Sequence, residues 1–384
     1  MKQLTKKVFF YFVFCYIMIL IVIFTGNVQA AKNQETSKQV LTLFNWGEFL
    51  DPQTIIDFEK ETQIEVKQVF FSSNELAVTK IKSHFQYDLA ILSEYAIDQL
   101  IQANLLENIE KNKLKTTDKY YNIYNDEYNN LTRTQNFDDY AVPYFWGKVV
   151  LVYNKKKVQE KEIKKQGFDI LKKSGLRVAL CNNSRDGLML GLKAQSLSIN
   201  KMTQTNLEKA KKWLLDLKNE KPDLAFINDQ LIDRMSQKGR EYYDVVVAYS
   251  GDANFLIEKN DNLDVISPEK GTNVWVDALI MPKGSQKNLA YQFINFLRNK
   301  DNYNKNLLYV KYDSPYENAT NKIKIKDKDE VYQYDKDHQK LINTYWNDVI
   351  AYPNKKDYWL FIFSGLILIS VIIIYFVNGG KRFS

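Results

Sequence analysis

The chain contains little cysteine and histidine, with two residues of each among its 384. Cys15 lies in an N-terminal apolar run, which leaves Cys181 without a partner for a disulfide within the body of the protein. His84 and His338 are far apart in the sequence, and no cysteine or histidine pair has the spacing of a zinc site. These absences argue against a disulfide-stabilised body and against a zinc centre.

The sequence also lacks the motifs of common catalytic and nucleotide-binding sites. It has no Gly-x-Ser-x-Gly elbow, P-loop, His-Glu-x-x-His or Gly-x-Gly-x-x-Gly. A pair of carboxylates such as a glycosidase uses is compatible with the composition, but nothing singles out one pair. We therefore expect a protein that is not an enzyme and that needs no cofactor.

The positive charge is concentrated outside the body of the chain. The formal net charge is +7, and five of the basic residues lie in two terminal flanks that carry no acid, which leaves +2 for the body. The body has no dense basic patch. This distribution argues against nucleic acid as a partner.

The N-terminus has the pattern of a secretory signal. Lys2, Lys6 and Lys7 precede an apolar run over residues 8–24, and the small residue Ala30 follows soon after. This order predicts a signal segment over residues 1–30 that is cleaved after Ala30. The apolar run is long for a signal peptide, so an uncleaved signal anchor is the alternative.

The C-terminus has the pattern of a membrane span. No charge interrupts residues 359–377, and a helix of this length spans about 28 Å, close to the hydrocarbon thickness of a bilayer. Lys381 and Arg382 follow the run and favour a cytoplasmic C-terminus. We therefore expect a protein of the cell membrane, with a transmembrane helix over 359–377 and a body on the extracytoplasmic side.

The body shows two series of alternating strands and helices. In the first, strands are expected at 40–45, 64–70 and 87–92, and helices at 52–61, 74–83 and 94–103. In the second, strands are expected at 176–181, 223–227, 243–249, 264–268 and 274–282, and helices at 185–196, 203–219, 228–237 and 288–298. Such alternation is typical of parallel βαβ units.

The long β-prone run at 141–153 lies between the two series. It contains Pro143 and Gly147, which argue against a central strand and for a crossing between two lobes. Residues 111–137 read as an irregular connection, and helical segments are expected around 328–350. The fold class is therefore α/β, with two lobes around a ligand cleft that binds by hinge closure.

The stretch from Val40 to Phe49 is the first candidate for a binding site. It begins as a buried strand and ends in Asn-Trp-Gly-Glu, at the type of strand end where open α/β sheets hold ligands. Trp46 offers an aromatic face and Glu48 a negative charge, which together suit an organic cation. The alternative is a capped βα turn in which Trp46 belongs to the core.

Further polar and aromatic residues follow other predicted strands. They are Ser93, Tyr95, Asp186, Tyr249 and Asp252. Asp186 and Asp252 could equally be acids favoured by a helix N-terminus, and the tyrosines could be core residues.

Trp275 and Asp277 lie inside a predicted strand, where two-residue spacing places their side chains on one face. An aspartate in an apolar strand is costly unless it is paired or solvated, so we expect Asp277 to face the cleft. Trp275 could equally fill the core.

Several of these stretches, taken in order, resemble the bacterial spermidine/putrescine-binding proteins of polyamine ABC importers. The similarity runs from about residue 40 to 350 and rests on residues 45–49, 87–95, 142–147, 275–277 and 345–349. It implies two α/β lobes with a polyamine between them. Residues 40–144 and 276–320 would form one lobe, and residues 145–275 and 321–357 the other.

The resemblance also implies roles for individual residues. Aromatic stacking on the methylene chain falls to Trp46, Tyr95, Tyr249, Trp275 and Tyr312. Ammonium groups would be held by Glu48, Asp186 and Asp277, with Ser93 as a polar contact, and Asp252 matches an aspartate of putrescine-preferring members.

Five positions depart from the family pattern: Gly47, Phe49, Glu94, Asn183 and Trp346. Phe49 replaces a tyrosine of the binding site, Glu94 is an extra acid, and Asn183 replaces a second aspartate. The loss of that carboxylate, together with the presence of Asp252, leans toward the shorter diamine.

The sequence therefore predicts an extracytoplasmic polyamine-binding subunit, with ABC permease subunits and a cytoplasmic ATPase as partners. The alternatives are a binding protein for another small solute, such as an amino acid or a ferric complex, a sensor or adhesin ectodomain without a transport role, and an extracellular hydrolase.

Overall fold

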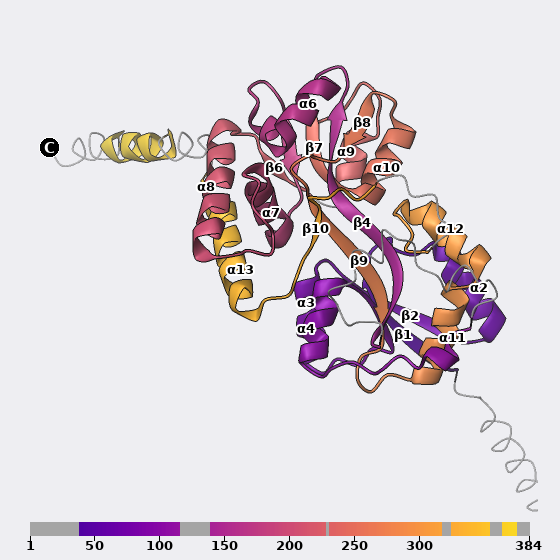
Figure 1. Ribbon diagram of the computed structural model, residues 1–384. Helices are drawn as coiled ribbons and strands as arrows, with labels where there is room; N and C mark the ends of the chain where they lie inside the picture. The colour runs from indigo at the N-terminus through magenta and orange to yellow at the C-terminus, as the bar shows by residue number, and fades with distance from the viewer. Residues whose placement is uncertain (1–37, 116–138, 228–229, 317–323, 354–362, 375–384) are drawn as a thin grey trace, which may run out of the picture.

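The computed structural model describes residues 38–115, 139–227, 230–316, 324–353 and 363–374 (Figure 1). The predicted signal segment, residues 1–30, and most of the predicted irregular connection, at 116–137, lie outside these ranges.

The described strands form one ten-stranded sheet. Its main order is β2-β1-β3-β9-β4-β7-β5-β6, with β10 paired to β9 and β8 paired to β4. The strands are β1 Val40–Trp46, β2 Glu65–Phe71, β3 Leu89–Ser93, β4 Ala141–Asn154, β5 Val178–Leu180, β6 Ala225–Phe226, β7 Val245–Tyr249, β8 Leu263–Ile266, β9 Asn273–Ile280 and β10 Glu330–Val331.

The first series of strands and helices confirms the predicted βαβ pattern to within about two residues. Strand β1 pairs in parallel with both β2 and β3. Helix α2 begins at Pro52, where the carboxylate of Asp51 accepts a hydrogen bond from the backbone N–H of Gln53. Proline suits the first turn of a helix because that turn leaves backbone donors unpaired in any case. The helices of this series are α2 Pro52–Thr62, α3 Asn74–Lys82 and α4 Glu94–Gln102.

The remaining helices confirm most of the second series. They are η1 Lys111–Lys113, α6 Glu160–Gln166, η3 Gly167–Lys172, α7 Ser184–Ala194, α8 Gln204–Glu220, α9 Leu231–Met235, α10 Ser250–Lys259, α11 Lys287–Leu297, α12 Lys300–Val310 and α13 Lys336–Ala351. The sequence analysis did not predict α6, η3, α10 or α12. The segment expected to be helical at 328–350 contains the short strand β10 before α13.

Strand β4 connects the two groups of strands. Its residues 141–148 pair with β9, and its residues 149–153 pair with β7. The predicted crossing is therefore confirmed, but the prediction that this run is not a central strand is wrong. The ladder tolerates proline because the β4–β9 register shifts between Pro143 and Phe145, an irregularity of the kind that accommodates a residue without an N–H group.

Helices cover both faces of the sheet (Figure 1). One apolar cluster includes Val78 and Ala96 of α3 and α4 and continues to Leu190 and Leu214 of α7 and α8. The opposite face is buried in two separate clusters, one formed with α2 and α11 and the other with α9 and α10. The structure is thus two α/β lobes that share two long central strands.

The predicted membrane segment, residues 359–377, is described only at 363–374. These residues are helical, and apolar side chains such as Phe363, Ile367 and Ile374 are exposed. Within the described ranges, no helix is both long enough and apolar enough to cross a bilayer.

A buried ion pair attaches the chain before β10 to the crossing strand. The ammonium group of Lys148 in β4 contacts the carboxylate of Asp329, and both side chains are fully buried. Lys148 also donates to the backbone carbonyl of Lys324 at 3.2 Å, and Asp329 accepts from the backbone N–H of Thr272 at 3.0 Å. Burial lowers the pKa of Lys148, and the negative charge of Asp329 opposes that effect.

We expect Asp329→Asn to lower the free energy of unfolding by about 3–5 kcal/mol, because it leaves the Lys148 ammonium buried without its counter-charge. Urea denaturation measures the change, and the double variant Lys148→Met/Asp329→Asn should lose less than the sum of the single changes. Lys238→Ala, which breaks an exposed ion pair with Asp261, serves as control and should cost less than about 1 kcal/mol. Equal effects of the buried and exposed changes would contradict this account.

Candidate functional site

Two polar side chains meet where β3 ends beside β9. The antiparallel register places Ser93 opposite Asp277. The Ser93 hydroxyl donates to Asp277 Oδ1 at 2.6 Å, and Asn74 Nδ2 of α3 donates to the Ser93 oxygen at 2.9 Å. Asp277 is buried, so this short chain of hydrogen bonds holds a carboxylate inside an apolar strand.

Glu94, the first residue of α4, lies at the same place. Its carboxylate oxygen Oε2 accepts a hydrogen bond from the backbone N–H of Val276 at 2.9 Å, and the side chain is buried. The other oxygen, Oε1, is buried and has no hydrogen-bond partner among the described residues.

Both carboxyl groups are shifted toward their neutral forms. Burial raises the pKa of Asp277 to about 7, against the opposing effect of the Ser93 hydrogen bond. Burial also raises the pKa of Glu94 to about 8, and the nearby charge of Asp277 raises it further, whereas the Val276 N–H favours the ionised form. A cation that replaced the lost solvation would be strongly favoured here.

An aromatic group adjoins these carboxylates. The ring of Trp275 meets Tyr312 edge-on with centroids 4.8 Å apart, and it meets Tyr249 at 6.4 Å. Two glycines allow this packing: a Cβ at Gly147 would lie 2.5 Å from the Trp275 ring, and one at Gly251 would lie 2.6 Å from the Tyr312 ring.

Asp186 joins this group from α7. Its carboxylate accepts hydrogen bonds from the Tyr249 hydroxyl at 2.8 Å and from Asn273 Nδ2 at 2.7 Å. Burial raises the pKa of Asp186, and these two hydrogen bonds oppose the shift. Asn183 caps α7, because its side-chain oxygen accepts hydrogen bonds from the backbone N–H groups of Arg185 and Asp186.

We call these seven residues the carboxylate–aromatic cluster: Ser93, Glu94, Asp186, Tyr249, Trp275, Asp277 and Tyr312. Its members come from both series of strands and helices: Ser93 and Glu94 belong to the first, and Asp186 and Tyr249 belong to the second. Six of them are site residues that the sequence analysis named, and Glu94 is the extra acid noted there.

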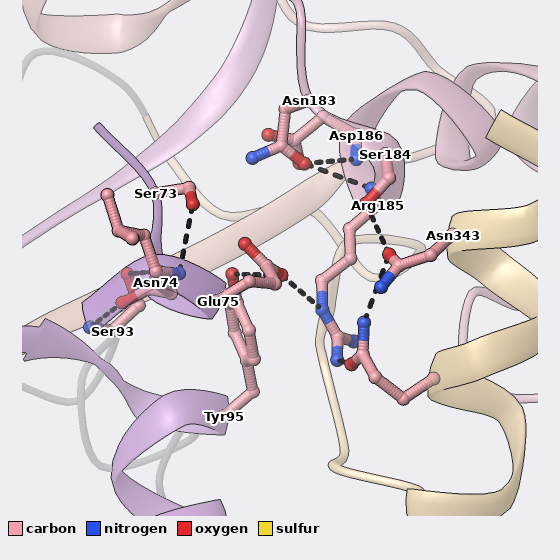
Figure 2. A network of polar contacts seen from close by, with 12 residues as sticks. Ser73, Asn74, Glu75, Ser93, Tyr95, Asn183, Ser184, Arg185, Asp186 and Asn343 are labelled. Carbon is pink, nitrogen blue, oxygen red and sulfur yellow. Dashed lines mark hydrogen bonds and ion pairs between the residues drawn. The ribbon is translucent and has the colours of Figure 1, made fainter. Parts of the chain in front are cut away.

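Beside the cluster, Arg185 of the second series contacts residues of the first series, as Figure 2 shows. From α7 its guanidinium lies 4.1 Å from the centroid of the Tyr95 ring on α4, and its Nε atom lies 3.6 Å from Glu75 Oε1 on α3. It also hydrogen-bonds to the side chain of Gln339 on α13. The sequence analysis missed this role, although Arg185 lies next to Asp186 in the same helical turn.

Tyr95 is therefore linked to the cluster through Arg185, and its hydroxyl lies 3.3 Å from Glu75 Oε1. Asp252 lies half-buried in the first turn of α10. Burial raises the pKa of Tyr312 and of the Cys181 thiol, and the charge of Asp252 raises both further, with Asp186 also contributing at Cys181.

The site residues predicted at the end of β1 are not members of the seven-residue cluster. Trp46 packs on Phe71 with ring centroids 4.5 Å apart, and its Nε1 atom is buried without a partner among the described residues. Glu48 is exposed and has a φ of 55°. Phe49 is buried, and its ring centroid lies 5.8 Å from that of Tyr312, so it packs against one member of the cluster.

Two more residues were beyond sequence reasoning. Asn74 and Asn273 orient Ser93 and Asp186, yet neither lies at a predicted strand end with any motif around it. Trp346 of α13, which departs from the family pattern, packs against α7: a Cβ at Gly187 would lie 1.9 Å from its ring.

A cavity of about 460 Å³ lies elsewhere, between β1, β2 and α3, with Phe70, Lys80 and Phe85 among its lining residues. No predicted site residue lines it, and its walls carry no carboxylate. The chemistry of the cluster makes it the better candidate for a cation.

We expect Asp277→Asn to stabilise the protein without ligand at high pH. The folded-state pKa of Asp277 lies above its ordinary value of 3.8, so folding loses stability as pH rises from that value to about 7. Removal of the acid should recover up to about 4 kcal/mol near pH 8 and almost nothing near pH 4.

Urea denaturation of both proteins across this pH range measures the difference. Glu48→Gln, an exposed acid outside the cluster, serves as control and should give parallel pH profiles. A constant difference between wild type and Asp277→Asn at every pH would contradict the burial of an ionisable carboxyl group.

Comparisons with known proteins identify the family of the chain. Residues 86–340 match the family described as bacterial extracellular solute-binding protein. The spermidine/putrescine-binding periplasmic protein of Salmonella typhimurium is 27% identical over 272 residues, 69% of this chain and 74% of that protein. The putrescine/agmatine-binding protein of Pseudomonas aeruginosa is 23% identical over 315 residues, 77% of this chain and 83% of that protein.

Among solved structures, a putative spermidine/putrescine ABC transporter from Listeria monocytogenes superposes with a TM-score of 0.71 and 28% identity, over 82% of this chain and 99% of that one. These matches confirm the resemblance drawn from the sequence. The chain belongs to the family of bacterial extracellular solute-binding proteins.

Proposed function

We propose that this protein is the extracytoplasmic solute-binding subunit of an ABC importer and that it captures putrescine or spermidine between its two lobes. The observation that carries the proposal is the carboxylate–aromatic cluster, in which buried acids with raised pKa values adjoin aromatic rings. Relatives named for binding spermidine and putrescine support the choice of ligand.

The chemistry of a polyamine complements the cluster. Its ammonium groups would be held by Asp277 and Asp186, with Ser93 as a further polar contact, and its methylene chain would lie against Trp275, Tyr249 and Tyr312. Charge-assisted hydrogen bonds are worth about 1.5–3 kcal/mol each, so two or three of them with aromatic stacking give micromolar or better affinity. Nothing in this scheme requires turnover of the ligand.

The other predicted residues would extend the site. We propose that Trp46, Glu48 and Tyr95 close one side of the ligand and that Asp252 lies at the other end, with Phe49 behind Tyr312. We assign the lobes to residues 40–144 with 276–320 and 145–275 with 321–357. The link from Arg185 to Tyr95 and Glu75 would then stabilise the closed arrangement of the lobes.

We further propose that the C-terminal segment tethers the binding body to the cell membrane, beside its permease and the ATPase. The uncharged run at 359–377 and the exposed apolar side chains of helical residues 363–374 support this.

Titration of the full-length protein in a non-ionic detergent tests the ligand. We expect saturable binding of putrescine or spermidine and no heat from an amino-acid panel. Trp275→Ala removes a stacking face and Asp277→Asn a counter-charge, so each should weaken binding by at least about tenfold, or about 1.4 kcal/mol.

Circular dichroism establishes that both variants are folded. Tyr242→Ala, which removes an exposed aromatic outside the cluster, is the matched control and should bind as the wild type does. Silence from every polyamine by a folded wild-type protein would refute the function, and normal binding by both cluster variants would refute the site.

Fractionation of the producing cells tests the tether. We expect the full-length chain in the membrane fraction and a chain ending at residue 357 in the soluble extracytoplasmic fraction. Equal distribution of the two would contradict a C-terminal anchor.

A further inference from the structure

We propose that Glu94 determines specificity in the cluster: with Asp277 it forms a two-carboxylate subsite for one primary ammonium group of the ligand. This inference rests on the proposed function and assigns a ligand-binding role to an acid that departs from the family pattern.

The position of Glu94 supports this role. Strand β3 ends at Ser93, which pairs with Asp277, and the Glu94 carboxylate accepts the next backbone N–H of β9, that of Val276. One oxygen of Glu94 therefore continues the ladder. The second oxygen, Oε1, is buried with no hydrogen-bond partner among the described residues, which leaves a strong acceptor for an incoming donor. Asp277 is near enough for its charge to act on the Glu94 carboxyl group.

A purely structural role would not require an acid here. The side-chain carbonyl of glutamine accepts a backbone N–H equally well and carries no charge to desolvate. A buried glutamate is the costlier choice, because its ionised form loses solvation and is repelled by Asp277. A ligand cation that contacts both carboxylates removes that cost.

Among the described residues, three titratable or charged groups act on Glu94 or are acted on by it. They are Asp277 of β9, Arg185 of α7 and Tyr332, which follows β10. Arg185 favours the ionised form, but its guanidinium is engaged by Tyr95, Glu75 and Gln339. Within the described part of the chain, Arg185 forms no ion pair with either carboxylate, so the charge of the pair is not neutralised by a direct contact with Arg185.

A primary ammonium group fits this arrangement better than a secondary one. It has three N–H donors, which match Glu94 Oε1, an oxygen of Asp277 and one further acceptor. A secondary ammonium group has two. The subsite thus suits the end of a polyamine rather than its middle.

The subsite also couples binding to protons. The free protein holds protons on this pair near neutral pH, and a bound cation requires both carboxylates to be ionised. Binding should therefore release protons, and affinity should rise as pH increases through the range from about 7 to 8.

Titration of putrescine into the full-length protein near pH 7, in buffers of different ionisation enthalpy, measures both affinity and proton release. Glu94→Gln keeps the acceptor for Val276 and removes the charge. We expect it to bind at least about tenfold more weakly near pH 8 and to release about one proton fewer per ligand near pH 7. Glu61→Gln, an exposed acid at the end of α2, is the matched control and should leave both quantities unchanged.

The outcomes separate the two proposals. If the wild type binds no polyamine, the proposed function fails. If putrescine binds and Glu94→Gln matches the wild type in affinity and proton release, the function stands and the subsite is refuted. Should Glu94→Gln not fold, Asp277→Asn provides the second test: it retains Glu94, so weakened binding must still release protons, and binding without release would overturn the inference.

Discussion

The antiparallel pairing of β4 and β9 is the constraint on which the rest of the structure depends. Both strands are buried along their whole length, and β9 has β3 on its other side. The β4–β9 ladder places Gly147 beside Trp275, and the β3–β9 ladder places Ser93 beside Asp277. Gly147 leaves room for the Trp275 ring. Ser93 donates a hydrogen bond to the carboxylate of Asp277, which stabilises this acid inside the sheet. The site is therefore built into the sheet rather than attached to its loops.

A conflict between folding and binding follows from this arrangement. Asp277 and Glu94 are buried where ionisation is costly, and their raised pKa values express that cost. A fold optimised for stability alone would have neutral residues at both positions. In the proposed function, these unfavourable electrostatics would favour an organic cation, because a cation compensates for the solvation that burial removes.

Local patterns were enough to predict the elements of the first series, since each buried strand and its capped helix are encoded within about ten residues. They also indicated the strand-end residues Ser93, Asp186 and Tyr249. The polar helix α12 was not predicted, because its apolar positions are sparse. Its buried residues are Tyr303, Asn306 and Val310. The central position of β4 was misjudged, because the bulge that accommodates Pro143 exists only in the paired sheet.

The sequence by itself determined the α/β class, the family and the chemical character of the site, because strand and helix periodicity, ordered motifs and residue types are local properties. Only the tertiary structure decided which of those residues meet. Asn273 orients Asp186 from 87 positions away, and Arg185 reaches Tyr95 and Glu75 across the two groups of elements. Burial likewise belongs to the folded chain, and burial is what raises the pKa values of Glu94 and Asp277 above those of exposed acids.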